Sequence, residues 1–354
     1  MKILHTSDIH LKEDSPERLD AFRKILSVAT AEQVDLLVIA GDMFNSEEDA
    51  DKLRNKLRNM LSGNSFKVLI IPGNHDQFAF RGDVHYGSDV TTVLETPYQT
   101  LNFDDVRIIA IPYAEKRIVD LATDLSASLQ KEKTNVLVVH CTLDLLGMSS
   151  EGMGDEQDCK YMPVSCETLK LIGFDYVLAG HCHSSYKVYP IDSAKWFVYP
   201  GSPISITEKE QNKRSVNLLD TTSGLREIAL DTPYFLTLRI EVNPGKEKEA
   251  LESLTLELQG HTKGFGIIDV EISGFIQMNE NDFEKMIQDA IEPYQIRKID
   301  KTYNDISYIL NDPLYKMYQE EILTSKELDD DIREEMESLV LEAFISLKAR
   351  ERGT

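Results

Sequence analysis

The sequence predicts an α/β protein with two packed sheets flanked by helices, followed by a small α+β domain and a pair of C-terminal helices. Two observations carry this prediction. Five short, mainly apolar stretches of strand length each lead into residues typical of metal ligands. The first three of these stretches alternate with helical patterns, which is typical of a parallel sheet covered by helices. At 354 residues the chain is also longer than one core needs, so we expect more than one domain.

The five stretches are residues 36–40, 68–71, 136–139, 176–179 and, less cleanly, 3–4. Apolar runs of this length without polar alternation are typical of parallel strands that are buried on both faces. Ligands bind past the carboxyl ends of such strands. We therefore expect the polar residues that follow the runs to meet at one edge. These residues are Asp8, His10, Asp42, Asn74, His75, His140, His181 and His183.

Helix signals separate the first strands. Ser15 and Pro16 predict an N-cap and a first helical position, and Ser46 predicts the cap of a second helix. A strand is expected over 106–111 and a helix over 115–129. Residues 147–155 are rich in glycine but lack the patterns of nucleotide-binding loops, so we do not interpret them as a nucleotide site.

After His183 the pattern changes to short strand-like stretches at 186–190, 195–199, 215–220 and 225–230, which we expect to form the second sheet. The first domain is predicted to span 1–232. Residues 233–305 predict an α+β domain with strands at 235–240 and 267–272 and helices at 247–258 and 282–291. Residues 306–354 predict two amphipathic helices, which either close on their own domain or present an apolar groove to a partner.

The formal net charge is −23. A protein that holds DNA by its own surface is usually basic, so a nucleic-acid role would need metals, local basic residues or a basic partner. No apolar stretch reaches the ~20 residues of a membrane helix, and the N-terminus has no signal-peptide core, so we expect a cytoplasmic protein. The four cysteines, Cys141, Cys159, Cys166 and Cys182, predict buried packing residues rather than disulfides or metal ligands.

The ligand types favour a site for two metals. Two divalent ions ~3.5–4 Å apart can clamp the attacking and leaving oxygens of a phosphoryl displacement. Asp42 is the candidate for the shared ligand, because a carboxylate has two oxygens. Asp8 and His10 are expected to point the same way from an extended backbone, and His181 and His183 to repeat this arrangement. Imidazole, carboxylate and amide ligands suit Mn, Fe or Zn.

His75 has a different predicted role, since it follows a candidate ligand directly on a glycine-containing turn. There it could protonate a leaving oxygen or contact a phosphate. The remaining histidines lack such a context. His5 is expected to be a sheet residue, and His85 to be solvated.

Taken together, Asp8-x-His10, Gly41-Asp42, Gly73-Asn74-His75-Asp76, His140 and Gly180-His181-x-His183 resemble the motif set of the calcineurin-like metallophosphoesterases. The resemblance implies a four-layer α/β/β/α core over residues 1 to about 200. It also implies two manganese ions, one held by Asp8, His10, Asp42 and His183, the other by Asp42, Asn74, His140 and His181. His75 would be the catalytic proton donor and phosphate contact.

Residues 4–11, 40–44 and 199–203, together with the order of the parts, resemble the SbcD-type DNA repair nucleases. This resemblance implies a homodimeric hydrolase of DNA repair and recombination, with 3′-to-5′ exonuclease and endonuclease activity. It implies that 233–305 is a capping domain that binds DNA, and that the helices of 306–354 bind an SMC-like coiled-coil ATPase of the SbcC type.

Two other functions remain open. The first is a small-substrate metallophosphodiesterase or phosphatase unrelated to DNA, which the acidic charge favours. The second is a non-catalytic scaffold, which the complete ligand set disfavours. The ~120 residues that follow the core argue for a macromolecular partner, since a small pocket needs none of them.

Overall fold

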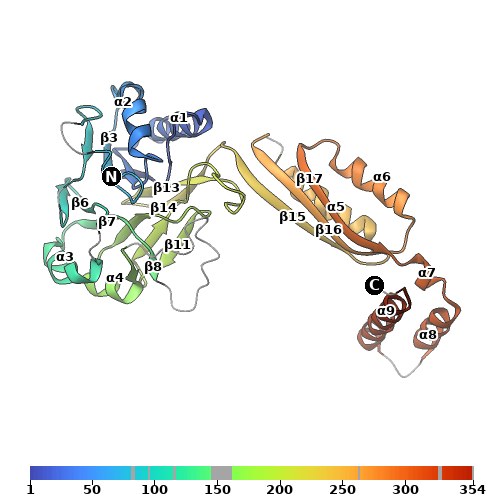
Figure 1. Ribbon diagram of the computed structural model, residues 1–354. Helices are drawn as coiled ribbons and strands as arrows, with labels where there is room; N and C mark the ends of the chain where they lie inside the picture. The colour runs from blue at the N-terminus through green and yellow to red at the C-terminus, as the bar shows by residue number, and fades with distance from the viewer. Residues whose placement is uncertain are drawn as a thin grey trace. The chain divides into compact units, whose positions relative to one another are not determined.

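The computed structural model of the chain describes residues 1–80, 84–94, 96–114, 117–144, 162–261, 264–325 and 329–352. The chain divides into two compact units, Met1–Phe235 and Leu236–Thr354 (Figure 1). The glycine-rich segment 147–155 and Cys159 lie outside the described residues. No helix in the described part of the chain is both long and apolar enough to cross a membrane.

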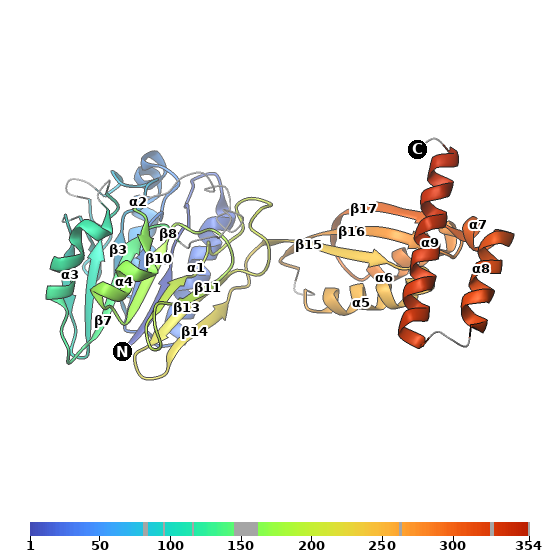
Figure 2. The same cartoon turned by 90° about the horizontal axis from the view of Figure 1, so that it is seen from below.

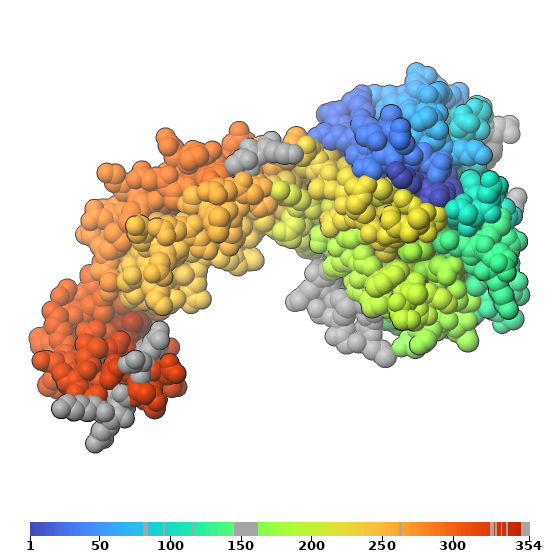
Figure 3. Space-filling model, turned by 180° about the vertical axis from the view of Figure 1, so that it is seen from behind, coloured from blue at the N-terminus to red at the C-terminus, as the bar shows by residue number. Residues whose placement is uncertain are grey.

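The first sheet of the N-terminal unit has the order β14-β13-β1-β2-β3-β4. Strands β1 to β4 run parallel to one another, whereas β13 is antiparallel to β1 and β14 is antiparallel to β13. Figure 3 shows the yellow atoms of β13 and β14 beside the dark blue atoms of the N-terminal strand. The strands are β1 (Lys2–Thr6), β2 (Leu36–Ala40), β3 (Lys67–Ile71), β4 (Val90–Thr92), β13 (Ser215–Asp220) and β14 (Gly224–Ala229).

The second sheet has the order β11-β12-β10-β7-β6-β5. Its four central strands are parallel, and antiparallel strands pair at both edges. A two-stranded ribbon of β8 (Leu143–Asp144) and β9 (Val164–Ser165) lies outside it. The strands of the sheet are β5 (Gln99–Asn102), β6 (Val106–Ile111), β7 (Thr134–His140), β10 (Tyr176–Gly180), β11 (Lys187–Pro190) and β12 (Trp196–Tyr199).

The two sheets and their helices form four layers, as predicted. One apolar cluster lies between the sheets and joins residues such as Val38 and Val138. A second cluster joins the first sheet to helices α1 (Pro16–Ala31) and α2 (Glu47–Leu61). A third joins the second sheet to helices α3 (Ala122–Ser128) and α4 (Cys166–Ile172). Figure 1 shows these helix pairs on opposite sides of the unit.

The helix starts follow the sequence signals with two differences. Ser46 caps α2 through a hydrogen bond from the backbone N–H of Asp49 to its side chain, whereas Ser15 precedes α1 without such a bond. The helix expected over 115–129 is shorter than predicted. A 3-10 turn, η1 (Ile118–Leu121), precedes α3, and residues 115 and 116 lie outside the described part of the chain.

The prediction that the strand-like stretches of 186–230 form the second sheet by themselves is wrong. The first two, β11 and β12, extend the second sheet, whereas β13 and β14 extend the first. The five ligand-bearing strands are likewise divided, with β1, β2 and β3 in one sheet and β7 and β10 in the other. Local pattern predicted each strand but carried no information on its long-range pairing.

The C-terminal unit has a three-stranded sheet, β15-β16-β17, with helices α5 and α6 packed side by side on one face (Figure 2). Its elements are β15 (Tyr234–Val242), α5 (Glu247–Gln259), β16 (Gly266–Ile276), α6 (Glu280–Ile291) and β17 (Ile296–Asp305). Strand β17 was not predicted, because its charged residues hide the alternation of a strand. Helices α7 (Ser307–Leu310), α8 (Pro313–Thr324) and α9 (Asp330–Arg352) follow.

Candidate metal centre

The predicted ligands come together in the N-terminal unit, past the carboxyl ends of five strands. The segments after β1, β2 and β3 supply residues from the first sheet, and β7 and β10 supply residues from the second. The two groups are joined directly. The backbone N–H of His181 lies 3.1 Å from both carboxylate oxygens of Asp8, which follows strand β1 of the other sheet. The site therefore lies where the ends of the two sheets meet.

The backbone of these segments is not extended, contrary to the prediction for Asp8 and His10. Asp8, His10, Asp42 and His181 all have positive φ, between 47° and 98°. Such left-handed residues are uncommon outside glycine, and they concentrate at functional sites. Hydrogen bonds hold the segments in place, since the N–H of Asp8 donates to Gly41 O and that of His10 donates to Asp42 O.

Two glycines allow the close approach of the segments. A Cβ at Gly73 would lie 2.1 Å from Asp42 Oδ1, and a Cβ at Gly180 would lie 2.0 Å from the carbonyl oxygen of Ala40. Both distances are far below a normal contact, so any larger residue would force the site apart.

One half of the site contains Asp8, His10 and His183, all buried. The Nε2 atoms of His10 and His183 lie 3.1 Å apart, and His183 Nε2 lies 3.8 Å from Asp8 Oδ1. Ser7 Oγ donates to the other oxygen of Asp8 at 2.5 Å. The three side chains thus direct two imidazole nitrogens and a carboxylate oxygen at one small volume.

The other half contains Asn74, His140 and His181. His140 Nε2 lies 2.9 Å from Asn74 Oδ1, and the rings of His140 and His181 meet edge to face at 5.4 Å. The Nδ1 atom of His140 lies 3.0 Å from the carbonyl oxygen of Ala40. Because that carbonyl can only accept, Nδ1 carries the hydrogen and Nε2 is the atom available to a ligand.

Asp42 lies between the two halves. Its Oδ1 accepts a hydrogen bond of 2.9 Å from the backbone N–H of His75. Its Oδ2 lies 3.8 Å from His10 Nε2 and 3.4 Å from His140 Nε2. This oxygen is buried, and among the described residues it receives no aligned hydrogen bond. A buried carboxylate oxygen between imidazole nitrogens of both halves fits a ligand shared by two cations.

The charges of the site also suit cations. Burial alone would raise the pKa of Asp42, but the imidazoles of His140, His10 and His75 together outweigh this effect and lower the pKa well below the usual range. Burial by itself lowers the pKa of His140, but the Asp42 carboxylate raises it above the usual value. Burial also lowers the pKa of His183, but the carboxylates of Glu210 and Asp8 raise it above the usual value. The carboxylates thus favour positive charge on their neighbours, and divalent ions would compete with these protons.

His75 lies at the exposed rim of the site, in contrast to the candidate ligands, which are buried except for the half-buried Asn74. Its ring packs edge to face on His10, with ring centres 4.8 Å apart. Arg18 lies near the same half, where its guanidinium donates to His10 O at 2.7 Å and to Asn45 Oδ1 at 3.3 Å. An exposed imidazole beside buried ligands is placed to reach a substrate.

Two supporting carboxylates were not predicted. Buried Asp76 accepts hydrogen bonds from the backbone N–H of Gly73 at 2.7 Å and of Phe44 at 3.1 Å, which ties together the loops that carry Asn74 and Asp42. Glu210 lies 3.2 Å from His183 Nδ1. Asp76 belongs to a motif that was recognised without a role for this residue. Glu210 stands in a polar stretch without any recognisable pattern.

The other candidates lie apart from this chemistry. His5 is buried in β1, and His85 is exposed. Cys141 and Cys182 are buried, and burial raises the pKa of both thiols, as expected of packing residues. Cys166 is free and partly buried.

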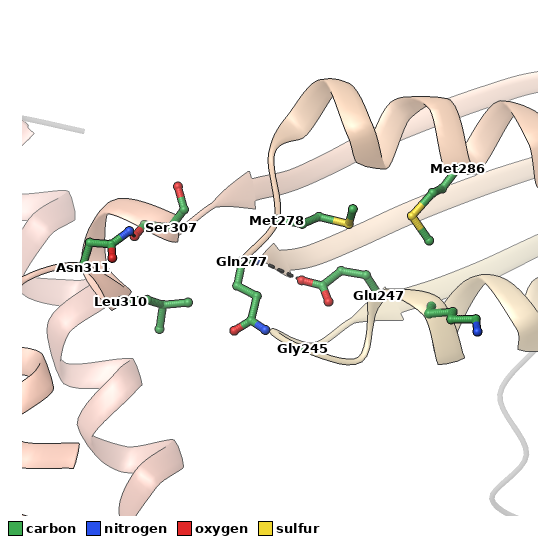
Figure 4. Close-up of a pocket in the computed structure, with 9 residues that line it drawn as sticks. Gly245, Glu247, Gln277, Met278, Met286, Ser307, Leu310 and Asn311 are labelled. Carbon is green, nitrogen blue, oxygen red and sulfur yellow. Dashed lines mark hydrogen bonds between the residues drawn. The ribbon is translucent and has the colours of Figure 1, made fainter. Parts of the chain in front are cut away.

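The C-terminal unit contains a cavity of about 530 Å³ beside α5, α6 and α7 (Figure 4). Glu247, Gln277, Met278 and Leu310 line part of it, and the Glu247 carboxylate accepts a hydrogen bond from the backbone N–H of Gln277 at 2.7 Å. The lining residues that the structure describes include no histidine, cysteine or aspartate. This cavity therefore lacks the chemistry found in the first unit.

The comparisons with known proteins include a family model that covers the part of the chain containing this site. A family model described as calcineurin-like phosphoesterase matches residues 1–185. The SbcD component of the SbcCD nuclease of Staphylococcus epidermidis is 23% identical over 71% of this chain and 72% of its own. The DNA double-strand break repair protein Mre11 of Sulfolobus acidocaldarius is also 23% identical, over 84% and 82%. Among solved structures, a dimetal phosphatase of Danio rerio matches with a TM-score of 0.45 and 10% identity, over 62% and 91%.

Proposed function

The chain belongs to the calcineurin-like phosphoesterase family, and from this premise we propose that it is a dinuclear-metal phosphodiesterase, the nuclease subunit of an SbcCD-like DNA repair complex. The proposal of two metals rests on the position of Asp42 Oδ2, which lies within 4 Å of an imidazole nitrogen from each half of the site. The curated relatives named as SbcD and Mre11 support the choice of DNA as substrate.

The residues would divide between two positions. One ion would be held by Asp8, His10, Asp42 and His183, and the other by Asp42, Asn74, His140 and His181. When bound, two such ions polarise a phosphoryl oxygen and lower the pKa of a water molecule. Imidazole and oxygen ligands without thiolate suit Mn²⁺, which we propose as the metal.

The protein's own contribution is orientation and proton transfer. His75 would donate a proton to the leaving oxygen or contact the phosphate, since it is exposed at the rim and held by its backbone bond to Asp42. The reactions proposed are 3′-to-5′ exonuclease and endonuclease cleavage.

The helices of 306–354 are proposed to bind an SMC-like coiled-coil ATPase of the SbcC type. Helices α8 and α9 lie side by side in Figure 2, and Tyr315, Ile322 and Phe344 are buried. Other apolar side chains of the pair remain exposed, which is typical of a helix-binding surface. These exposed residues are Leu314, Met317, Tyr318, Leu323, Ile332, Met336, Leu339 and Leu347.

Residues 233–305 are proposed to cap the site and to bind DNA, although their charge argues for weak binding. This segment has eight Lys and Arg against fourteen Asp and Glu. Arg239 pairs with Glu271 at 2.8 Å and Arg297 with Asp269 at 2.5 Å. Phosphate contacts would have to displace these carboxylates, so we propose that DNA capture depends on the ATPase.

The second candidate function is a small-substrate phosphodiesterase or phosphatase. The net charge of −23 and the paired cations of the second unit favour it. A homodimer is proposed from the resemblance alone, and a monomeric mass in light scattering at working concentration would contradict it.

The decisive experiment measures manganese-dependent degradation of end-labelled linear double-stranded DNA, with bis-p-nitrophenyl phosphate as a parallel small substrate. Shortened DNA that is not seen with His75→Ala supports the nuclease. If only the small diester is cleaved, either DNA cleavage requires the ATPase or the protein acts on small substrates. Adding a purified coiled-coil ATPase distinguishes these two explanations. If DNA is cleaved only with the ATPase, the nuclease proposal holds, and if DNA stays intact, the second candidate is favoured.

A further inference from the structure

The two imidazoles supplied by the second sheet have different groups behind them. His140 Nδ1 lies 3.0 Å from a neutral carbonyl oxygen, that of Ala40. His183 Nδ1 instead lies 3.2 Å from the carboxylate oxygen Oε1 of Glu210. A carboxylate is the stronger acceptor of the two. The two halves of the site therefore differ in what supports their histidines.

Glu210 is held in one orientation. Its side chain is fully buried. Its second oxygen, Oε2, accepts a hydrogen bond of 2.8 Å from the backbone N–H of Ile206 and lies 2.9 Å from Ser202 Oγ. With both oxygens engaged, the carboxylate cannot turn away from His183, and a buried charge of this kind is retained only with such partners.

The backbone of His183 is held by the same network. Buried Arg214 donates to the carbonyl oxygen of His183 at 2.5 Å and to that of Ser202 at 2.8 Å. Ser202 belongs to the Pro200-Gly201-Ser202 sequence, none of whose residues is a candidate metal ligand. A Cβ at Gly201 would lie 2.0 Å from the carbonyl oxygen of Ser184, so only glycine allows this approach. The network thus holds both the imidazole and the backbone carbonyl group of His183.

We propose that Glu210 is a positioning residue that makes the metal position at His183 the tighter of the two, an inference that rests on the dinuclear function proposed above. A carboxylate only accepts hydrogen bonds, so His183 carries its hydrogen on Nδ1 and directs the lone pair of Nε2 at the site. There Nε2 faces His10 Nε2 at 3.1 Å and Asp8 Oδ1 at 3.8 Å. A hydrogen bond to a carboxylate also makes the imidazole a stronger ligand.

The test is a titration of the metal-stripped full-length chain with Mn²⁺, followed by the electron paramagnetic resonance signal of free Mn²⁺. The wild-type chain is expected to bind two ions in unequal steps. In Glu210→Gln the tighter step weakens by about 10- to 100-fold, while the weaker step changes little. This selectivity separates a positioning role from a general loss of structure, which would weaken both steps.

Glu227→Gln is the matched control. Glu227 is an exposed carboxylate that accepts a hydrogen bond from Ser215 Oγ at 2.6 Å, so the variant loses the same charge and a similar bond. Both steps should match the wild type.

Three outcomes for Glu210→Gln would overturn the proposal: both steps unchanged, both weakened alike, or only the weaker step affected. If the wild-type chain binds no Mn²⁺, this result would instead contradict the proposed dinuclear function itself. If Glu210→Gln does not fold, the zinc-loaded wild-type chain with ¹⁵N-labelled histidine tests the hydrogen bond between His183 and Glu210 on which the proposal rests. A hydrogen on Nδ1 of His183 is expected, and a hydrogen on Nε2 would overturn the proposal.

Discussion

The Nε2 atoms of His10 and His183 face each other at 3.1 Å, although 173 residues separate them in the chain. Two neutral imidazoles gain little from such a contact unless a hydrogen or a cation lies between them. The pair therefore connects metal binding to the stability of the fold.

Metal removal is predicted to destabilise the protein. Each ion that binds only the folded chain adds about 2.7 kcal/mol to the free energy of unfolding when its free concentration is 100 times its dissociation constant. Urea unfolding with Mn²⁺ and with a chelator measures this difference. Equal midpoints in both conditions would show that the site binds no Mn²⁺.

Asp42→Asn is predicted to lower the number of bound Mn²⁺ ions from two to one or none, because Asn offers one neutral oxygen where Asp42 offers two charged ones. Metal content after gel filtration measures this. Asp35→Asn is the matched control at the other end of the same strand, where Asp35 is exposed and accepts a hydrogen bond of 2.7 Å from the N–H of Lys2. Two bound ions in Asp42→Asn would exclude a shared ligand.

His75→Ala is predicted to bind both ions but to cleave DNA about 10²- to 10⁴-fold more slowly, since a proton donor to the leaving oxygen is lost. The loss should be much smaller for bis-p-nitrophenyl phosphate, whose leaving group needs no proton. Comparing the two rates for one variant measures this. Equal losses on both substrates would favour a phosphate contact over proton donation.

Leu339→Arg is predicted to weaken binding of the coiled-coil ATPase and to leave metal binding unchanged. Leu339 of α9 is 57% exposed, and a charge at the centre of a helix-binding surface costs about 2 kcal/mol or more, which is ~30-fold in affinity. Pull-down of the purified ATPase measures this. Leu171→Arg is the control, because Leu171 of α4 is 77% exposed in the other unit. Equal binding by both variants would place the interface elsewhere.

His5 is predicted to make the metal-free protein less stable in acid. Burial lowers its pKa from 6.5 to about 3, so the unfolded chain takes up a proton that the folded chain does not. The contribution of His5 to stability is complete above pH 6.5 and is lost as the pH falls toward 3. Each pH unit in this window costs about 1.4 kcal/mol.

Urea unfolding of wild-type and His5→Leu chains between pH 7 and 5 tests this prediction. Any change in packing is independent of pH, so the difference in slope belongs to the titration of His5. Parallel curves for the two chains would contradict it.

Much of this architecture could be predicted because the information was local. The apolar runs before Asp42 and Asn74 predicted buried strands, and Ser46 predicted the start of α2, where its side chain accepts a hydrogen bond from the Asp49 N–H. The structure brings every predicted site residue into one place.

The rest depends on long-range pairing. Nothing near Ser215 shows that its strand pairs with β1 and not with β11 or β12. Glu210 follows His183 by 27 residues, and only the folded chain brings them together. On α8, Leu314 and Met317 are exposed although Ile322 is buried, because Tyr315 packs inward instead.

The pairing of β1 with β13 delays completion of the first sheet until late in the synthesis of the chain. Lys2 and Asp220 are register partners. More than two hundred further residues must therefore be synthesised after β1 before its partner strand β13 is available. Contacts of such long separation form slowly. During synthesis one edge of β1 is exposed, and an exposed edge invites pairing with other chains. We therefore expect nascent chains that stop before residue 215 to depend on chaperones, and full-length chains to need them far less.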